Sequence, residues 1–356
     1  MAANGSQWQP MAANGSQWQP MTDKPSRQID LGQKMITRKL TKAIRKYRWS
    51  LPSAGSVPLR WHIGRPNFGD DLNPYFFGKL LSDSVHFANQ ARRHLLGIGS
   101  IVNTVNAGSI VVGSGLLSPE MNPKLSAMRI ISLRGYRTAE SIGYDPGYYG
   151  DPALLVARLF PQSIQPTYRL GLIPHHSQAK QWRPLVKSGS NGTFAHSFGI
   201  NARNHDAKVM GESRSRQDVL YIDPSWHPLR VIDSIRSCQG ILSQSLHGLI
   251  IADAYGIPNG WLSPDPQMEG GEFKFEDYYS TTNAPKHSMQ TDSIRKYLDA
   301  KDLPLFVSPY RFDLADYQSF LVSEIKREFA IENVPASSCH MGCSMVEPKK
   351  VAIDRR

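Results

Sequence analysis

After Pro52 the chain alternates short apolar runs with amphipathic stretches, a pattern typical of α/β domains built on parallel sheets. The apolar runs, bounded by Gly, Pro, Asp or Ser, predict strands at Val57–Ile63, Gly108–Gly113, Met128–Leu133, Tyr168–Ile173, Asp218–Ile222, Gly240–Leu242 and Gly260–Leu262. Spacing of three and four residues predicts helices at Pro74–Ser82, Thr138–Ser141, Leu229–Ser237, Leu246–Tyr255, Thr291–Asp299 and Asp313–Phe329. We therefore predict an α/β fold.

A run with linker composition divides this pattern near its middle. Between Phe160 and Thr167 two prolines flank polar residues, which favours a domain boundary. We predict a Rossmann-like domain over residues 53–163, a second one with closing helices over 164–330, and a polar tail over 331–356. Because such folds bind ligands beyond the carboxyl ends of their strands, residues that follow strands are the functional candidates.

The first 52 residues differ from the rest of the chain. Residues 1–10 recur letter for letter as 11–20, and we set this duplicated, tag-like segment aside. Residues 21–52 form a basic amphipathic segment, with seven Lys or Arg and no acid between Lys34 and Arg48. Its apolar residues have helical spacing: Met35, Ile36, Leu40, Ala43, Ile44 and Tyr47. Three interpretations stay open: docking by the apolar stripe, contact with an anionic membrane, and nucleic-acid binding. No nucleic-acid motif supports the third.

Composition excludes several classes of protein. The chain is 40% apolar and 20% charged, with a formal net charge of +11, which is a globular composition. It has no apolar run long enough to span a membrane, and the segment after Met21 lacks a signal-like core, so we expect a cytoplasmic protein, peripheral at the inner face of the membrane if the basic segment binds lipid. Cys238 lies in an apolar pattern and Cys339 and Cys343 in the polar tail, which favours a reducing compartment and no metal site.

The joint after the first strand predicts a site loop. It carries Asn67, Gly69, Asp70, Asp71 and Asn73 and leads into a helix. Free backbone N–H groups at such a joint bind anions or hydroxyls, so we expect acceptor-binding residues here. The structural alternative is that the carboxylates only cap the helix. Two adjacent carboxylates without a third are a weak metal site.

Cations follow two other strands. Arg134 and Arg137 flank a glycine turn, and guanidinium groups suit carboxylates and phosphates because they form paired hydrogen bonds. His175 and His176 end another buried strand, where one imidazole would bind an anion while the other packs. Surface or structural roles are the alternative for all four residues.

The most informative joint contains Ser243, Ser245 and His247. A strand runs into a serine-rich turn, and a helix begins at Ser245, so His247 lies in the first helical turn. The helix dipole favours a neutral imidazole, whereas a bound anion favours the imidazolium. His247 is therefore expected to be a proton donor that its substrate switches on; a buried, hydrogen-bonded histidine is the alternative.

Taken in order, these motifs resemble the polysaccharide pyruvyl transferase family, particularly its exopolysaccharide branch. The matching segments are Asn67–Pro74, Val112–Gly115, Arg134–Gly135, Tyr149–Leu155, Gly171–His175, Leu242–Gly248 and Lys274–Tyr279. The resemblance implies a GT-B-like pair of Rossmann-type domains facing a central cleft. It also implies transfer of pyruvate from phosphoenolpyruvate to two hydroxyls of a polysaccharide or lipid-linked sugar, which gives a ketal and phosphate.

The resemblance further implies that His247 is the general acid and that neither a metal nor a cofactor is needed. Family members outside this branch often carry an arginine two residues before this histidine, where this chain has Ser245. Donor-binding residues are therefore expected among Arg134, Arg137, His175, His176, Ser243 and Ser245. Two alternatives remain: a GT-B glycosyltransferase that uses a nucleotide sugar, and a catalytically inactive scaffold at a membrane surface.

Overall fold

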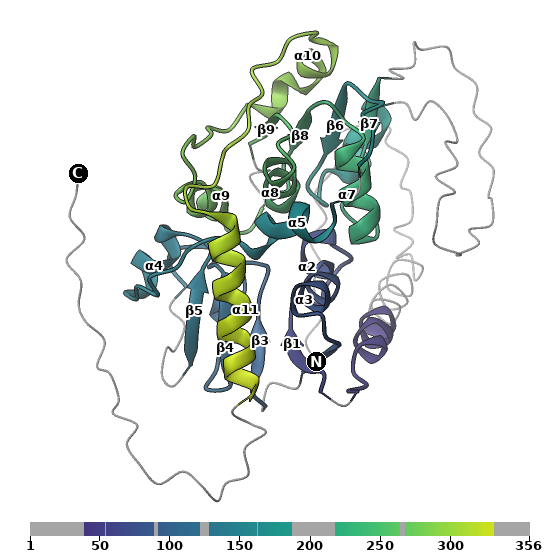
Figure 1. The fold of residues 1–356 in the computed structure, drawn as a ribbon. Coiled ribbons are helices and arrows are strands. Elements are labelled where there is room, and N and C mark those ends of the chain that lie inside the picture. The colour runs from purple at the N-terminus through teal and green to yellow at the C-terminus, as the bar shows by residue number, and fades with distance from the viewer. Residues whose placement is uncertain are drawn as a thin grey trace, which may run out of the picture. The chain divides into compact units, whose positions relative to one another are not determined.

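Two parallel β-sheets form the framework of the protein (Figure 1). The first has the order β2-β1-β3-β4-β5 and contains β1 (Val57–Arg60), β2 (Val85–Phe87), β3 (His94–Leu96), β4 (Ser109–Ser114) and β5 (Arg129–Leu133). The second has the order β7-β6-β8-β9 and contains β6 (Leu170–Ile173), β7 (Val219–Tyr221), β8 (Ile241–Ser243) and β9 (Asn259–Trp261). The computed structural model describes residues 39–53, 55–88, 92–121, 128–161, 163–186, 218–263 and 268–330. The duplicated segment, Met35, Ile36, and the tail with Cys339 and Cys343 lie outside these ranges.

Helices cover the sheets, which explains why the central strands are apolar throughout. Every residue of β4, β6 and β8 is buried, as expected of parallel strands packed on both faces. In the first half of the chain the helices are α2 (Phe68–Asp71), α3 (Asn73–Leu81), η1 (Val102–Thr104), α4 (Tyr136–Ile142), η2 (Pro152–Leu155) and α5 (Val156–Leu159). In the second half they are α6 (Ala179–Trp182), η3 (Arg183–Leu185), α7 (Pro228–Arg236), α8 (Leu246–Ala254), α9 (Phe273–Tyr279), η4 (Thr291–Ser293), α10 (Ile294–Asp299) and α11 (Leu314–Ala330).

The predicted α/β pattern is confirmed, since every predicted strand and helix has a counterpart. Sequence analysis missed β2, β3 and α9. The two strands have only three residues each, too few to show alternation, and α9 mixes aromatic and charged residues without a clear stripe. Two parallel sheets fit Rossmann-like architecture. The GT-B arrangement and the domain limits stay predictions.

The last helix returns to the first sheet, beside which Figure 1 shows it in yellow. Arg129 of β5 binds Glu328 of α11 at 3.0 Å and Glu324 at 3.0 Å. Tyr317 of the same helix donates a hydrogen bond to the carbonyl of Gly150. Helix α11 therefore fastens to the first sheet and to the segment that follows it.

The basic segment contributes a helix over residues 39–48. The chain divides into two units, residues 1–41 and 42–356, and both sheets belong to the second. Within that unit Arg45 forms an ion pair with Asp71 and donates to the carbonyl of Gly64 at 2.8 Å. Ile44 and Tyr47 are 60% and 68% exposed, so docking through the apolar stripe is wrong for these residues. A charged residue anchors the helix instead.

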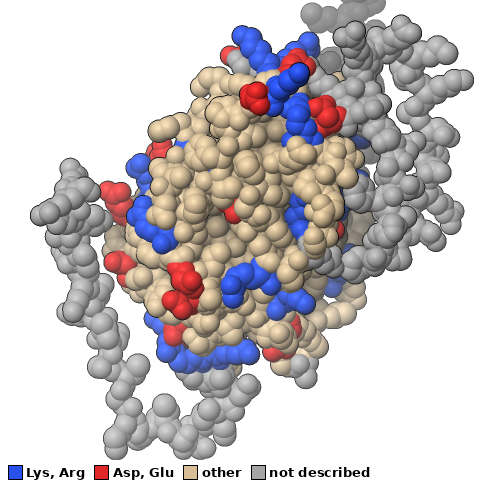
Figure 2. Space-filling model, turned by 45° about the horizontal axis from the view of Figure 1, so that its top comes forward, with Lys and Arg blue, Asp and Glu red and all other residues tan. Residues whose placement is uncertain are grey.

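Charge and hydropathy add two observations. On the face drawn in Figure 2, basic and acidic side chains both lie around a largely uncharged centre, so this face carries no continuous basic surface for nucleic acid. Among the described helices, none combines the length and apolar character that a membrane span requires.

Candidate active site

His247 and Asp151 face each other in the interior. His247 lies in the first turn of α8, and its Nε2 is 3.6 Å from Oδ2 of Asp151. Asp151 is fully buried, and its Oδ1 accepts a hydrogen bond from the backbone N–H of Ala153 at 2.9 Å, which caps η2. Within the described structure, neither of the two facing atoms has a hydrogen-bond partner. Unpartnered polar atoms in a protein interior need an explanation, which makes this pair a candidate for chemistry.

The first turn of α2 lies against the other side of the His247 ring. A Cβ atom added to Gly69 would lie 2.2 Å from Nδ1 of His247. The residue at this position therefore has to be glycine, because any side chain would displace the imidazole. This close approach brings the site loop predicted after the first strand next to the predicted general acid.

Asp70 is the member of that loop with a free carboxylate oxygen. Its Oδ2 accepts a hydrogen bond from Nδ2 of Asn67 at 3.1 Å, and its Oδ1 has no such partner in the part of the chain described. Burial raises the pKa of Asp70, and the charges of His62, His247 and Lys274 oppose this increase. Asp70 is therefore electrostatically coupled to His247.

The other residues of the predicted loop hold it in place. Asn67 caps α2 by accepting a hydrogen bond from the N–H of Gly69 at 3.2 Å. The buried Asn73 amide donates to the carbonyls of Asp70 and Ile98, at 3.0 and 2.8 Å. Asp71 is bound to Arg45. The structure shows these three residues in contacts that hold the loop. That they also bind the acceptor stays a prediction.

Arg134 is fully buried and engaged on all three guanidinium nitrogens. Nε donates to Oδ2 of Asp277 at 2.8 Å, Nη1 to Oγ of Ser100 at 2.6 Å, and Nη2 to the carbonyl of Leu116 at 2.7 Å. A Cβ on Gly115 would lie 2.3 Å from the guanidinium carbon, so only glycine at this position lets the backbone pack against the Arg134 guanidinium. This geometry does not support the expected direct contact of Arg134 with the donor.

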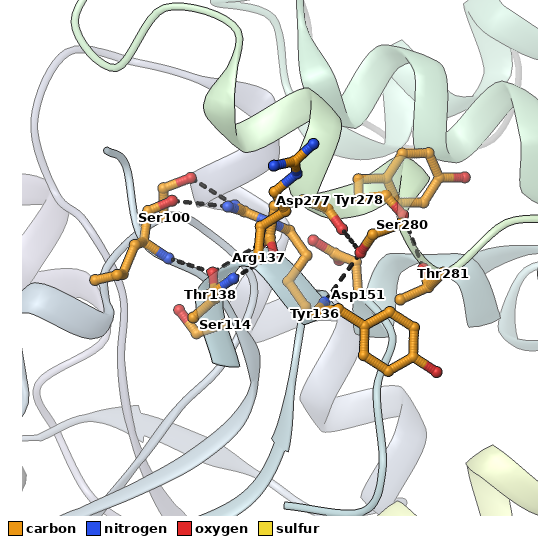
Figure 3. Close-up of polar contacts among 12 residues, drawn as sticks. Ser100, Ser114, Tyr136, Arg137, Thr138, Asp151, Asp277, Tyr278, Ser280 and Thr281 are labelled. Atoms are coloured by element: carbon orange, nitrogen blue, oxygen red, sulfur yellow. Dashed lines mark hydrogen bonds and ion pairs between the residues drawn. The ribbon is translucent and has the colours of Figure 1, made fainter. Parts of the chain in front are cut away.

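Asp277 connects α9 to the joint between β5 and α4 (Figure 3). Its carboxylate also accepts from the backbone N–H and the hydroxyl of Thr138, both at 2.8 Å. Arg137 lies on the surface of the same joint, 51% exposed and 3.6 Å from Glu276. The two arginines predicted as donor ligands therefore bind acidic residues of α9.

Lys274 of α9 is a functional candidate that sequence analysis did not single out. Burial, followed by the charge of Arg134, lowers the pKa of Lys274 to about 8, while Asp70 and Glu269 act in the opposite direction. No carboxylate or other hydrogen-bond partner contacts its ammonium within the described residues. The signal in the sequence was its place at the start of the motif Lys274–Tyr279.

The remaining candidates lie at the ends of β6 and β8. Ring centroids of His175 and His176 are 4.0 Å apart, and the backbone N–H of His175 donates to Oε1 of Gln244 at 3.0 Å. Burial, then Arg65 and Lys274, lowers the pKa of His176, so this imidazole faces other cations. Ser243 Oγ accepts from the N–H of Ser245 and donates to its carbonyl, at 2.9 Å each, which fixes the turn before His247. Among the described residues, no group of three or more His, Cys, Asp or Glu side chains is arranged to hold a metal ion.

Comparison with known proteins matches residues 96–266 to the family model "Polysaccharide pyruvyl transferase". The chain is 28% identical to the succinoglycan biosynthesis protein ExoV of Rhizobium meliloti over 63% of its own length and 64% of that relative, so the match spans less than two thirds of ExoV. It is 24% identical to an uncharacterized protein of Acanthamoeba polyphaga mimivirus, over 80% of this chain and 93% of that one.

A crystal structure of a functionally uncharacterized Klebsiella pneumoniae protein is also similar, at 13% identity over 71% of this chain and 98% of that one, with a TM-score of 0.34. The family model covers the segment that carries Arg134, Asp151 and His247. Over residues 96–266 the chain is therefore similar to the polysaccharide pyruvyl transferase family, and one of its relatives is a succinoglycan biosynthesis protein.

Proposed function

We propose that the protein transfers the pyruvyl group of phosphoenolpyruvate to two hydroxyls of a saccharide during exopolysaccharide biosynthesis. The products are a cyclic pyruvate ketal and phosphate. The observation that carries this proposal is the pairing of His247 with Asp151 at the start of α8, with both facing atoms unpartnered in the described structure. Similarity to the pyruvyl transferase family over residues 96–266 supports the reaction class.

His247 is the proton donor in this proposal. Its imidazolium protonates the methylene carbon of the donor, which makes the adjacent carbon electrophilic, and an acceptor hydroxyl forms the first C–O bond there. Loss of phosphate then allows the second hydroxyl to close the ketal. The Asp151 carboxylate, 3.6 Å from Nε2, stabilises the imidazolium by its negative charge.

Lys274 is the proposed cationic ligand of the donor. Phosphoenolpyruvate carries a phosphate and a carboxylate, and a partly buried ammonium that no carboxylate contacts within the described residues gains most from an anion. The first N–H groups of α8 add hydrogen-bond donors and the positive end of a helix dipole. His176, which lies in the field of Lys274, is a further ligand on this side.

Asp70 is the proposed base for the acceptor hydroxyl. Burial raises its pKa, which makes the carboxylate a better proton acceptor than an exposed one, and its Oδ1 is unengaged in the described structure. Placed between the two Rossmann-like halves in a GT-B-like arrangement, Asp70 and His247 would act on the acceptor and the donor respectively.

We also propose that the enzyme works at an anionic membrane surface, on a lipid-linked acceptor. Ile44, Tyr47 and Leu51 are 60%, 68% and 71% exposed on the helix that carries Lys42 and Lys46 and just after it. Apolar side chains beside several cations suit insertion at the headgroup level of anionic lipids. Phosphoenolpyruvate serves as a substrate, and the proposed reaction needs no metal or redox cofactor.

The test compares two donors. Phosphoenolpyruvate is expected to raise the melting temperature of the purified protein, and phosphate release is expected to require a saccharide with two neighbouring hydroxyls. Stabilisation by a nucleotide sugar, with no response to phosphoenolpyruvate, would contradict the proposal and favour a glycosyltransferase. Lack of response to both donors would favour an inactive scaffold.

A further inference from the structure

A basic cavity of about 720 Å³ lies at the carboxyl ends of β1, β2 and β3. This volume falls in the range of roughly 300–1,000 Å³ that is typical of small-molecule sites. Its lining includes four cations and two imidazoles, contributed by Lys42, Lys46, Arg60, Arg92, His62 and His86. Among the described residues, neither Asp nor Glu lines it.

The cations of this cavity have no acidic partners in the described structure. Arg60 donates to the carbonyl of Ala88 at 3.2 Å, and its guanidinium lies 5.6 Å from the ring centroid of Phe87. Lys46 approaches the same ring at 5.5 Å. Lys42 and Arg92 are exposed and form no ion pair within the described residues. These positive charges are therefore available to a ligand.

The surroundings of the cavity oppose uncompensated positive charge. Burial lowers the pKa of Arg60, and burial together with the charge of Arg92 lowers the pKa of His86. A bound anion would reverse both effects, because an opposite charge stabilises the protonated form. The cavity thus has the electrostatic character of an anion site, supported by its geometry.

His62 connects the cavity to the candidate active site. It lines the cavity, and its charge lowers the pKa of Asp70, which is also coupled to His247. Its imidazole packs over the backbone of Gly64, where an added Cβ would lie 2.2 Å from Nε2. His62 therefore belongs both to the lining of the cavity and to the charged groups around Asp70.

We propose that this cavity binds the diphosphate of a glycosyl diphosphate acceptor, with the sugar extending past His62 toward Asp70. The inference rests on the proposed function and names its acceptor class. A diphosphate matches cations converging from three chain segments because it carries several negative charges on separated oxygens. A neutral saccharide has no group that would use them, and the donor is assigned to Lys274 and α8.

The test uses calorimetric titration of the full-length protein with three probes: inorganic diphosphate, a short-chain alkyl glycosyl diphosphate, and the corresponding neutral sugar. Each is titrated with and without phosphoenolpyruvate. The cavity variant is Lys46→Gln with Arg92→Gln, and the control is Lys79→Gln with Lys326→Gln, which removes the same charge from exposed positions outside the cavity. Loss of two charge-assisted contacts should weaken the glycosyl diphosphate at least about tenfold in the cavity variant alone.

Two outcomes would overturn the inference. One is equal affinity for the glycosyl diphosphate in the cavity variant and the control. The other is binding of inorganic diphosphate without binding of the glycosyl ester, which would indicate a site for a free anion. Phosphoenolpyruvate binding is scored separately, so its absence would contradict the proposed function while the cavity assignment would still be decided by the diphosphate titrations.

Discussion

The guanidinium of Arg134 binds the carboxylate of Asp277 at 2.8 Å, and both side chains are fully buried. The pair joins the end of β5 to α9, the helix that also carries Lys274. Because Asp277 further accepts two hydrogen bonds from Thr138, the contact fixes the position of α9. Arg134 thus positions the proposed donor ligand.

Arg134→Met should destabilise the fold by about 3–5 kcal/mol, because it leaves a buried carboxylate without its cation. Arg134→Lys should destabilise the fold less than Arg134→Met but still measurably, since an ammonium cannot reproduce three separately directed hydrogen bonds. Urea denaturation measures both effects, and Arg137→Met on the exposed side of the joint is the control. Near-normal stability of Arg134→Met combined with lost phosphoenolpyruvate binding would show that Arg134 contacts the donor after all.

His247→Ala should abolish ketal formation while the protein keeps its fold. A positioned general acid contributes roughly 10²–10⁴-fold to a rate, so turnover should fall by at least that order while donor affinity changes less. Phosphate release with a competent acceptor measures turnover, and thermal unfolding monitors the fold. Turnover close to that of the unmodified protein would remove His247 from the mechanism.

Asp151→Asn tests whether the acid acts through His247. The amide oxygen can still accept the Ala153 N–H and cap η2, so stability should change little, but the negative charge beside the imidazolium is lost. Turnover should fall about 10²-fold or more, while phosphoenolpyruvate affinity changes less. A large loss of stability that accounts for the loss of turnover would assign Asp151 to packing alone.

Phosphoenolpyruvate affinity should decrease as the pH rises through about 8, because Lys274, with its pKa lowered to about 8, loses its charge there. Bound phosphoenolpyruvate favours the charged form of Lys274, so Lys274 should lose its proton at a higher pH in the complex than in the free protein. Lys274→Met should weaken binding about 10- to 100-fold at neutral pH. Lys274→Arg should remove the pH dependence, since a guanidinium stays charged. The same decrease in Lys274→Met and in the unmodified protein would exclude Lys274 as its cause.

The membrane proposal predicts that Ile44→Ser with Tyr47→Ser lowers cosedimentation with vesicles containing anionic phosphatidylserine. Both side chains are exposed, so their replacement should leave thermal stability unchanged. Phe306→Ser with Phe312→Ser removes two other exposed apolar side chains, 44% and 45% exposed, and serves as the control. Failure of the unmodified protein to bind these vesicles at low salt would contradict a membrane location.

Local patterns in the sequence determined the α/β class, the positions of the main strands along the chain and the start of the helix that carries His247. These features depend on residues close together in the chain: apolar runs, a serine-rich turn, and glycines at the ends of elements. The same logic placed Asp70 and His247 at strand-to-helix joints, where ligands bind in such folds. It also drew attention to Arg134 and Arg137, because their side chains suit anions.

Only the tertiary structure decided how these side chains are used. Arg134 and Asp277 are 143 positions apart, and nothing near either residue in the sequence indicates that they meet in the core. Packing of distant segments likewise brings Asp151 to His247 and gathers the cations around the cavity. It also leaves the Lys274 ammonium without a hydrogen-bond partner among the described residues. Burial and the supply of partners determine whether a charge stabilises the fold or binds a ligand, and both depend on contacts that sequence spacing does not specify.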